Sequence, residues 1–166
     1  MLAFLLFSSV VHADNYGWEL DVHETWFSLS QHGEVIWGDT IWLVFNKSDC
    51  SKAELGVNIS SYAKNVMAYE GQKLLLELQG QEVQGRVGFV SEVGSKGLKI
   101  ASVAMGLYKI DALKKWPDVT GSISVRISKK NTPDVLKQFD VRENYFSLFG
   151  LSEELRALTK YCSIKS

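Results

Sequence analysis

The sequence predicts a mainly β protein, either an antiparallel β-sandwich or an open barrel, with one short helix and a C-terminal amphipathic helix. Apolar and polar residues alternate over many short segments, as they do in half-buried strands. Turn residues separate these segments roughly every ten residues, which is typical of such folds. Between Gln72 and Met105 the links are too short for the crossover that parallel strands need, so we expect antiparallel pairing there.

Length and charge narrow the class of protein. The chain has 166 residues, which is the size of one domain, and 46% of them are hydrophobic, enough for a core. Eighteen Lys and Arg oppose nineteen Asp and Glu, which gives a formal net charge of -1. This balance excludes a strongly basic nucleic-acid-binding protein, and no nucleic-acid partner is expected.

The first thirteen residues, MLAFLLFSSVVHA, predict a secretory signal peptide over residues 1–13, cleaved after Ala13. A single domain then follows over residues 14–166. The apolar run is shorter than the roughly 20 residues that cross a bilayer, so we expect no stable membrane insertion. The location predicted is periplasmic or secreted. The alternative is an N-terminal strand or helix that is buried in the domain.

Cys50 and Cys162 are the two cysteines of the chain. Export to an oxidising compartment favours a disulfide between them. Such a bridge closes a loop of about a hundred residues, for which chain entropy gives roughly 4 to 5 kcal/mol of stability. The alternatives are two buried free thiols, or a catalytic or metal-binding cysteine.

The N-terminal part predicts three extended segments. Trp18, Leu20 and Val22 alternate with polar residues, and the alternation resumes in the opposite phase after a bulge or break near Glu24 or Thr25. Residues 31–33 predict a hairpin turn and residues 34–37 its returning strand. Residues 41–45 are apolar throughout, which predicts a central strand buried on both faces.

The remaining elements follow from similar patterns. Alternation predicts strands at residues 55–59, 72–79, 82–93, 98–105 and 119–128. A short helix is expected from Ile110 to Trp116, because Pro117 ends it. Ser152 is the expected N-cap of the last helix, in which Leu151, Leu155, Leu158 and Cys162 form one stripe.

A metal site is one functional hypothesis. Asp21 and His23 share a strand face, and His32 lies across the predicted hairpin, which is a possible set of two histidines and one carboxylate. This set would suit a metal-assisted hydrolase. The simpler interpretation is a solvated outer face, and the sequence indicates no other cofactor and no catalytic set.

Four tryptophans, Trp18, Trp26, Trp37 and Trp42, occur within 25 residues. Trp18 and Trp42 are expected in the core. Trp26 and Trp37, beside the break and the turn, are the expected exposed pair. Exposed indoles stack on sugar rings or anchor protein partners, so these two residues are the candidate binding site for a protein or glycan partner, as in a carbohydrate-binding module.

The C-terminal region resembles a known group of proteins. The segment YFSLFGL at residues 145–151, the following helix with Cys162, and the short helix at residues 110–116 before a Val/Ile strand are similar to bacterial exported proteins of the invasion-associated locus B type. Periplasmic accessory proteins of type VI secretion end in a similar way. The resemblance implies an exported, non-enzymatic binding or accessory protein of the bacterial envelope or secretome.

Overall fold

In the computed structural model, residues 17–36, 38–94, 96–116, 120–139 and 142–163 are described, and residues 159–161 and 163 by their backbone alone. The described chain is mainly β, as predicted, with all paired strands antiparallel. The strands are β1 (Glu19–Val22), β2 (Trp26–His32), β3 (Thr40–Asn46), β4 (Asp49–Ser61), β5 (Lys73–Leu78), β6 (Gln81–Val93), β7 (Leu98–Lys109), β8 (Ser122–Ile127) and β9 (Asn144–Ser147). The helices are the 3-10 helix η1 (Lys64–Tyr69), α1 (Ile110–Leu113), α3 (Pro133–Gln138) and α4 (Leu151–Ser163).

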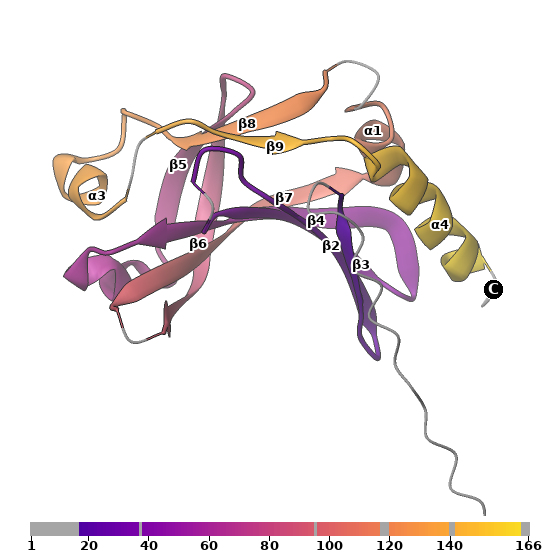
Figure 1. Cartoon of the computed structure of the whole chain (residues 1–166), viewed down its shortest axis with the longest axis horizontal. Coiled ribbons are helices and arrows are strands. Elements are labelled where there is room, and N and C mark those ends of the chain that lie inside the picture. Colours follow the sequence, from indigo (N-terminus) through magenta and orange to yellow (C-terminus); the bar gives the residue numbers. More distant parts are fainter. Residues whose placement is uncertain (1–16, 37, 95, 117–119, 140–141, 164–166) are drawn as a thin grey trace, which may run out of the picture.

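These nine strands form one curled sheet in the order β1-β2-β3-β4-β7-β6-β5-β8-β9. Figure 1 shows that the sheet curls until β8 and β9 lie across from β2, β4 and β7, with α4 at one end. The architecture is therefore a half-barrel, which corresponds to the open barrel among the two predicted alternatives. The curled sheet has an inner face, which holds the core, and an outer face.

Strand β3 shows how the two faces divide the residues. Ile41, Leu43 and Phe45 are fully buried on the inner face, whereas Trp42 and Val44 are half-buried on the outer face. The predicted central strand, buried on both faces, is wrong, because β3 is third from one edge and only its inner face enters the core. Because residues 41–45 are all apolar, they lack the alternation that would show which side chains face outward.

The predicted hairpin at residues 31–33 is also wrong. Strand β2 continues to His32, and Glu34 turns away toward β9, where its backbone N–H donates to the carbonyl of Tyr145 at 2.8 Å. The phase change near residue 24 is instead a tight turn, closed by a hydrogen bond from the N–H of His23 to the carbonyl of Trp26 at 3.0 Å. Strands β1 and β2 thus form a tight hairpin, and the strand that returns after His32 is β3, not residues 34–37.

The side chain of Asn144 holds strand β9 against the loop between β2 and β3. Asn144 is 2% exposed, and its Oδ1 accepts from the N–H of Val35 at 2.9 Å. Its Nδ2 donates to the carbonyl of Ile36 at 3.1 Å and to Oδ2 of the buried Asp39 at 3.2 Å. Any Cβ at Gly33 would lie 2.2 Å from that Nδ2, so glycine is needed where the amide passes. We call this set of contacts the Asn144 latch.

Trp18 makes a further contact with strand β9. Trp18 is 6% exposed, which confirms its predicted place in the core, and its Nε1 donates to the carbonyl of Ser147 at 3.1 Å. Glu34, Asn144 and Trp18 together satisfy backbone groups along the outer edge of β9. Because unpaired strand edges invite association, these contacts also protect the edge.

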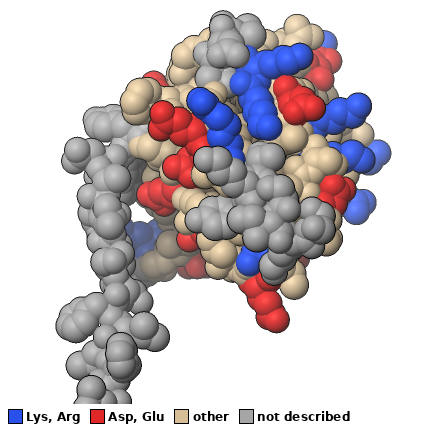
Figure 2. Space-filling view, turned by 90° about the vertical axis from the view of Figure 1, so that its right-hand side faces the viewer, with Lys and Arg blue, Asp and Glu red and all other residues tan. Residues whose placement is uncertain are grey.

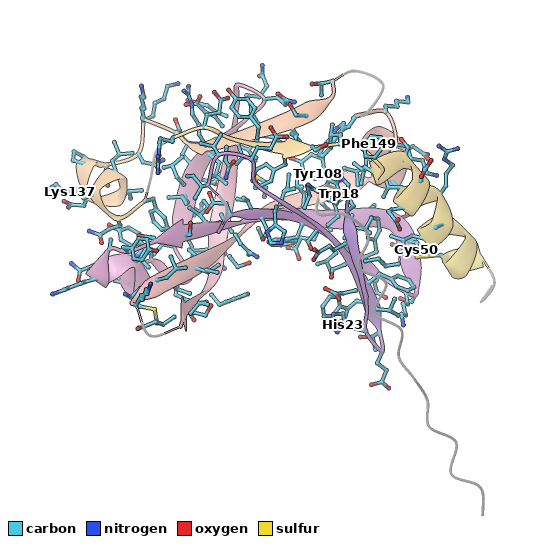
Figure 3. The ribbon with its side chains drawn as sticks, in the orientation of Figure 1. Trp18, His23, Cys50, Tyr108, Lys137 and Phe149 are labelled. Carbon is cyan, nitrogen blue, oxygen red and sulfur yellow. A yellow bond between two sulfur atoms is a disulfide. The ribbon has the colours of Figure 1, made fainter. Side chains whose placement is uncertain are left out.

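The C-terminal helix packs on the sheet through its predicted apolar stripe. Leu151, Leu155 and Leu158 are each at most 1% exposed. The helix begins at Leu151, so Ser152, the predicted N-cap, lies inside its first turn, where the carbonyl of Gly150 accepts two backbone N–H groups. A disulfide joins Cys50 to Cys162, as predicted, with the two Cα atoms 6.1 Å apart. Figure 3 shows Cys50 beside the last turns of α4.

We expect Asn144→Ala to lower the free energy of unfolding by about 2 to 4 kcal/mol, because it removes the acceptor of the Val35 and Ile36 N–H groups and one hydrogen bond of the buried Asp39 carboxylate. Urea unfolding followed by far-UV circular dichroism measures this. Tyr145→Ala removes an adjacent side chain that is 38% exposed and serves as the control. Equal stability of the two variants would contradict a structural role for the latch.

Candidate functional site

The outer face of the sheet differs between its two halves. Around β5 and β8 it carries ion pairs: Arg126 of β8 contacts Glu77 of β5 at 2.5 Å, and Lys130, which follows β8, contacts Glu82 of β6 at 2.5 Å. The hydrogen bond from Arg126 lowers the pKa of the Glu77 carboxyl below its usual value, and a bond from Ser128 adds to this. Charged pairs of this kind are typical of the solvated face of an antiparallel sheet.

The centre of the other half, on β2, β3, β4 and β7, carries few charges. Register and burial place twelve residues there, of which Glu54 alone carries a charge: Ser28, Ser30, Thr40, Trp42, Val44, Glu54, Gly56, Asn58, Ser60, Ile100, Ser102 and Ala104. Cations border this centre, with Lys52 and Lys109 paired beyond Glu54, and Arg86 of β6 paired with Ala104. At its centre are seven residues that we call the Trp42 platform: Ser30, Thr40, Trp42, Gly56, Asn58, Ser102 and Ala104. The platform has small side chains around one large aromatic ring.

The indole of Trp42 lies flat across the neighbouring strand. Trp42 is paired with Gly56 of β4, and a Cβ at position 56 would lie 2.0 Å from Cζ2 of the ring. The ring therefore occupies the space that any side chain at position 56 would need. An aromatic ring that covers a glycine of the adjacent strand shields its backbone and fixes the register of the pair.

Two hydrogen bonds fix the orientation of the ring. The indole Nε1 donates to Oδ1 of Asn58 at 3.1 Å, and Nδ2 of Asn58 donates to Oγ1 of Thr40 at 2.8 Å. These bonds run along the sheet surface, so one ring face rests on Gly56 and the other is directed outward. A ring that is oriented before a ligand arrives loses little conformational entropy on binding.

The platform supports binding by stacking and hydrogen bonding. Its members include no titratable side chain, and the hydroxyl and amide groups around the indole are neutral donors and acceptors. An aromatic face surrounded by such groups suits a ligand that has an apolar flat side and a polar rim.

The structure does not bring the predicted metal ligands together. Asp21 is paired with Ser28, four residues before His32 on β2, which corresponds to about 13 Å along the strand. His23 lies at the tip of the β1–β2 hairpin (Figure 3), where its ring stacks on Trp26 at 3.4 Å between centroids. Across the described ranges, no three His, Cys, Asp or Glu side chains are grouped so as to hold a metal ion.

Two of the tryptophans, Trp26 and Trp42, differ from expectation. Trp26 is half-buried beneath its contact with His23, and Trp37 lies outside the described residues. Trp42, expected in the core, is on the outer face because Ile41 and Leu43 occupy the inner side of β3. Sequence reasoning therefore missed the main residue of the site. A signal was present in Gly56, a glycine within an otherwise alternating strand, which marks a close approach by a neighbour.

The surface near α4 carries many charges, unlike the Trp42 platform. Figure 2 shows Lys and Arg side by side with Asp and Glu on this face. A hollow of about 400 Å³ lies at the start of the helix, with Phe149, which is 78% exposed, and both Glu153 and Arg156 in its lining. The mixture of signs selects no class of charged ligand.

No family model, curated protein or solved structure matches this chain. Among the described residues, no helix combines the length and apolar character needed to traverse a bilayer. The assignment of function therefore depends on the geometry of the chain itself.

We expect Gly56→Ala to lower the free energy of unfolding by about 1 to 3 kcal/mol, because the new methyl group displaces the indole of Trp42. Chemical unfolding monitored by tryptophan fluorescence checks this. Gly121→Ala is the matched control, since nothing lies within 4 Å of a Cβ there. In a Trp42→Ala background the cost of Gly56→Ala should largely vanish, and a persistent cost would contradict the packing of the ring on Gly56.

Proposed function

We propose that this chain is an exported, non-enzymatic binding protein of the bacterial envelope or secretome, and that it binds its partner through the Trp42 platform. The observation that carries the proposal is the fixed, outward-facing indole, which the small uncharged residues of the platform surround on the outer sheet face. Tryptophan is enriched among residues that dominate binding energy, especially where it is held rigid before the encounter.

The disulfide supports the exported location. Disulfides form and persist mainly in oxidising compartments, so a bridge between residues 112 positions apart favours export and agrees with the secretory signal that residues 1–13 predict. The bridge also ties the last helix to the end of the β3–β4 hairpin. The half-barrel that presents the platform is thereby held in one shape.

Export predicts two covalent changes in the full chain expressed in a Gram-negative bacterium. The protein recovered from the periplasm or medium should have lost residues 1–13, and its two cysteines should resist alkylation until a reductant is added. Intact-mass measurement with and without reduction tests both. An uncut leader, or two thiols that are alkylated in the native protein, would contradict the exported location.

Binding through the platform predicts that Trp42→Ala abolishes capture of envelope material by the immobilised, oxidised chain. The side chain removed is the largest contact surface of the site, so we expect at least about a tenfold loss. Quantification of retained material by surface plasmon resonance measures it. Trp26→Ala is the control, because Trp26 is also half-buried and lies on a neighbouring strand. Capture that is equal for all three proteins would overturn the proposed function.

A further inference from the structure

We propose that the ligand of the Trp42 platform is a neutral polysaccharide, an inference that rests on the proposed function and names its partner class. The track for this ligand would run across the outer face from Trp42 on β3 to Phe89 on β6. Both side chains belong to the same face, and the residues between them on β4 and β7 are small.

The register places the second aromatic residue. Asn58 of β4 is paired with Ser102 of β7, which is paired with Phe89 of β6. Phe89 is 55% exposed. Three strand spacings separate β3 from β6, or about 14 Å. Gly56, Ala104 and Ser102 occupy the interval on β4 and β7, and Arg86, paired with Ala104, lies beside Phe89 on β6.

The chemistry of the track matches a chain of neutral sugars. The apolar face of a pyranose ring stacks on an aromatic ring, and its hydroxyl groups exchange hydrogen bonds with hydroxyl and amide groups. Ser30, Thr40 and Asn58 supply such groups beside Trp42. Two separated aromatic rings suit a repeating ligand, which offers the same flat surface more than once.

The charges at the border have both signs. Glu19 and Asp21 of β1 are exposed and are paired with Ser30 and Ser28, and Glu54 lies two residues before Gly56, whereas Arg86 lies beside Phe89 at the other end. A polymer that carries one sign of charge throughout would be repelled at one end of the track, whereas neutral sugars would not.

A peptide fits this face less well. Strands β3, β4 and β7 are paired on both sides, so a peptide cannot add to the sheet there as an extra strand. Peptide side chains also need pockets, and the described hollows of about 400 and 340 Å³ are lined by residues that do not belong to the platform. A flat, continuous surface is better suited to the flat faces of a sugar chain.

The test uses the oxidised chain from residue 14 onward and soluble neutral polysaccharides of defined composition: a β-glucan, a galactomannan and chitooligosaccharides. Polygalacturonate is the acidic comparison. Isothermal titration should show binding to at least one neutral polymer and weaker binding to polygalacturonate. Trp42→Ala and Phe89→Ala should each weaken the binding about tenfold or more, whereas Trp26→Ala should leave it unchanged. Phe89→Ala keeps the test decisive if Trp42→Ala does not fold.

A second experiment treats the envelope material before capture. It distinguishes a failure of the glycan assignment from a failure of the proposed function. If Trp42-dependent capture disappears after periodate has cleaved the sugar diols, the glycan assignment is supported even when the three polymers do not bind. If capture survives periodate but is lost after protease treatment, the partner is a protein and the glycan assignment is overturned. Polysaccharide binding that neither Trp42→Ala nor Phe89→Ala weakens overturns it as well. If no capture depends on Trp42, the proposed function itself fails.

Discussion

The amide side chain of Asn144 is the contact on which the rest of the half-barrel depends. It joins β9, the last strand of the sheet, to the loop after β2, and it does so while almost fully buried. Without this contact the N–H groups of Val35 and Ile36 would lose their side-chain acceptor, and the carboxylate of Asp39, which Ser60 also contacts, would lose one of its hydrogen bonds. With it, the sheet is held curled and its inner face is separated from solvent.

The curl of the sheet determines which side chains face outward and are available for binding. The inner face takes the large aliphatic side chains of β3, β4 and β7, and the outer face keeps those that the core does not need. On most solvated sheets this outer set is charged. Here one half follows that rule, with Arg126 and Glu77 paired on it, and the other half instead presents Trp42 among small neutral residues. The difference between the two halves is what marks a candidate site on an otherwise ordinary sheet.

Much of the fold could be predicted from the sequence because alternation and turn chemistry are local signals. The antiparallel strands from β5 to β7, the stripe of α4 and the pairing of Cys50 with Cys162 all agree with the structure. The Asn144 latch could not be predicted, since it joins residues that are 105 to 109 positions apart. Trp42 was expected in the core because residues 41–45 are all apolar, and such a run does not show which side chains face inward.

Because the ring of Trp42 lies flat on Gly56, the two positions are expected to change together during evolution. Neither residue can change alone without a steric penalty or an uncovered backbone, so homologous chains should keep both or replace both together. A paired Trp and Gly on adjacent strands, found with a distant cysteine pair, would therefore identify kinship at levels of divergence where general sequence similarity has faded. The same pair would also distinguish those homologues that retain the surface from those that have lost it.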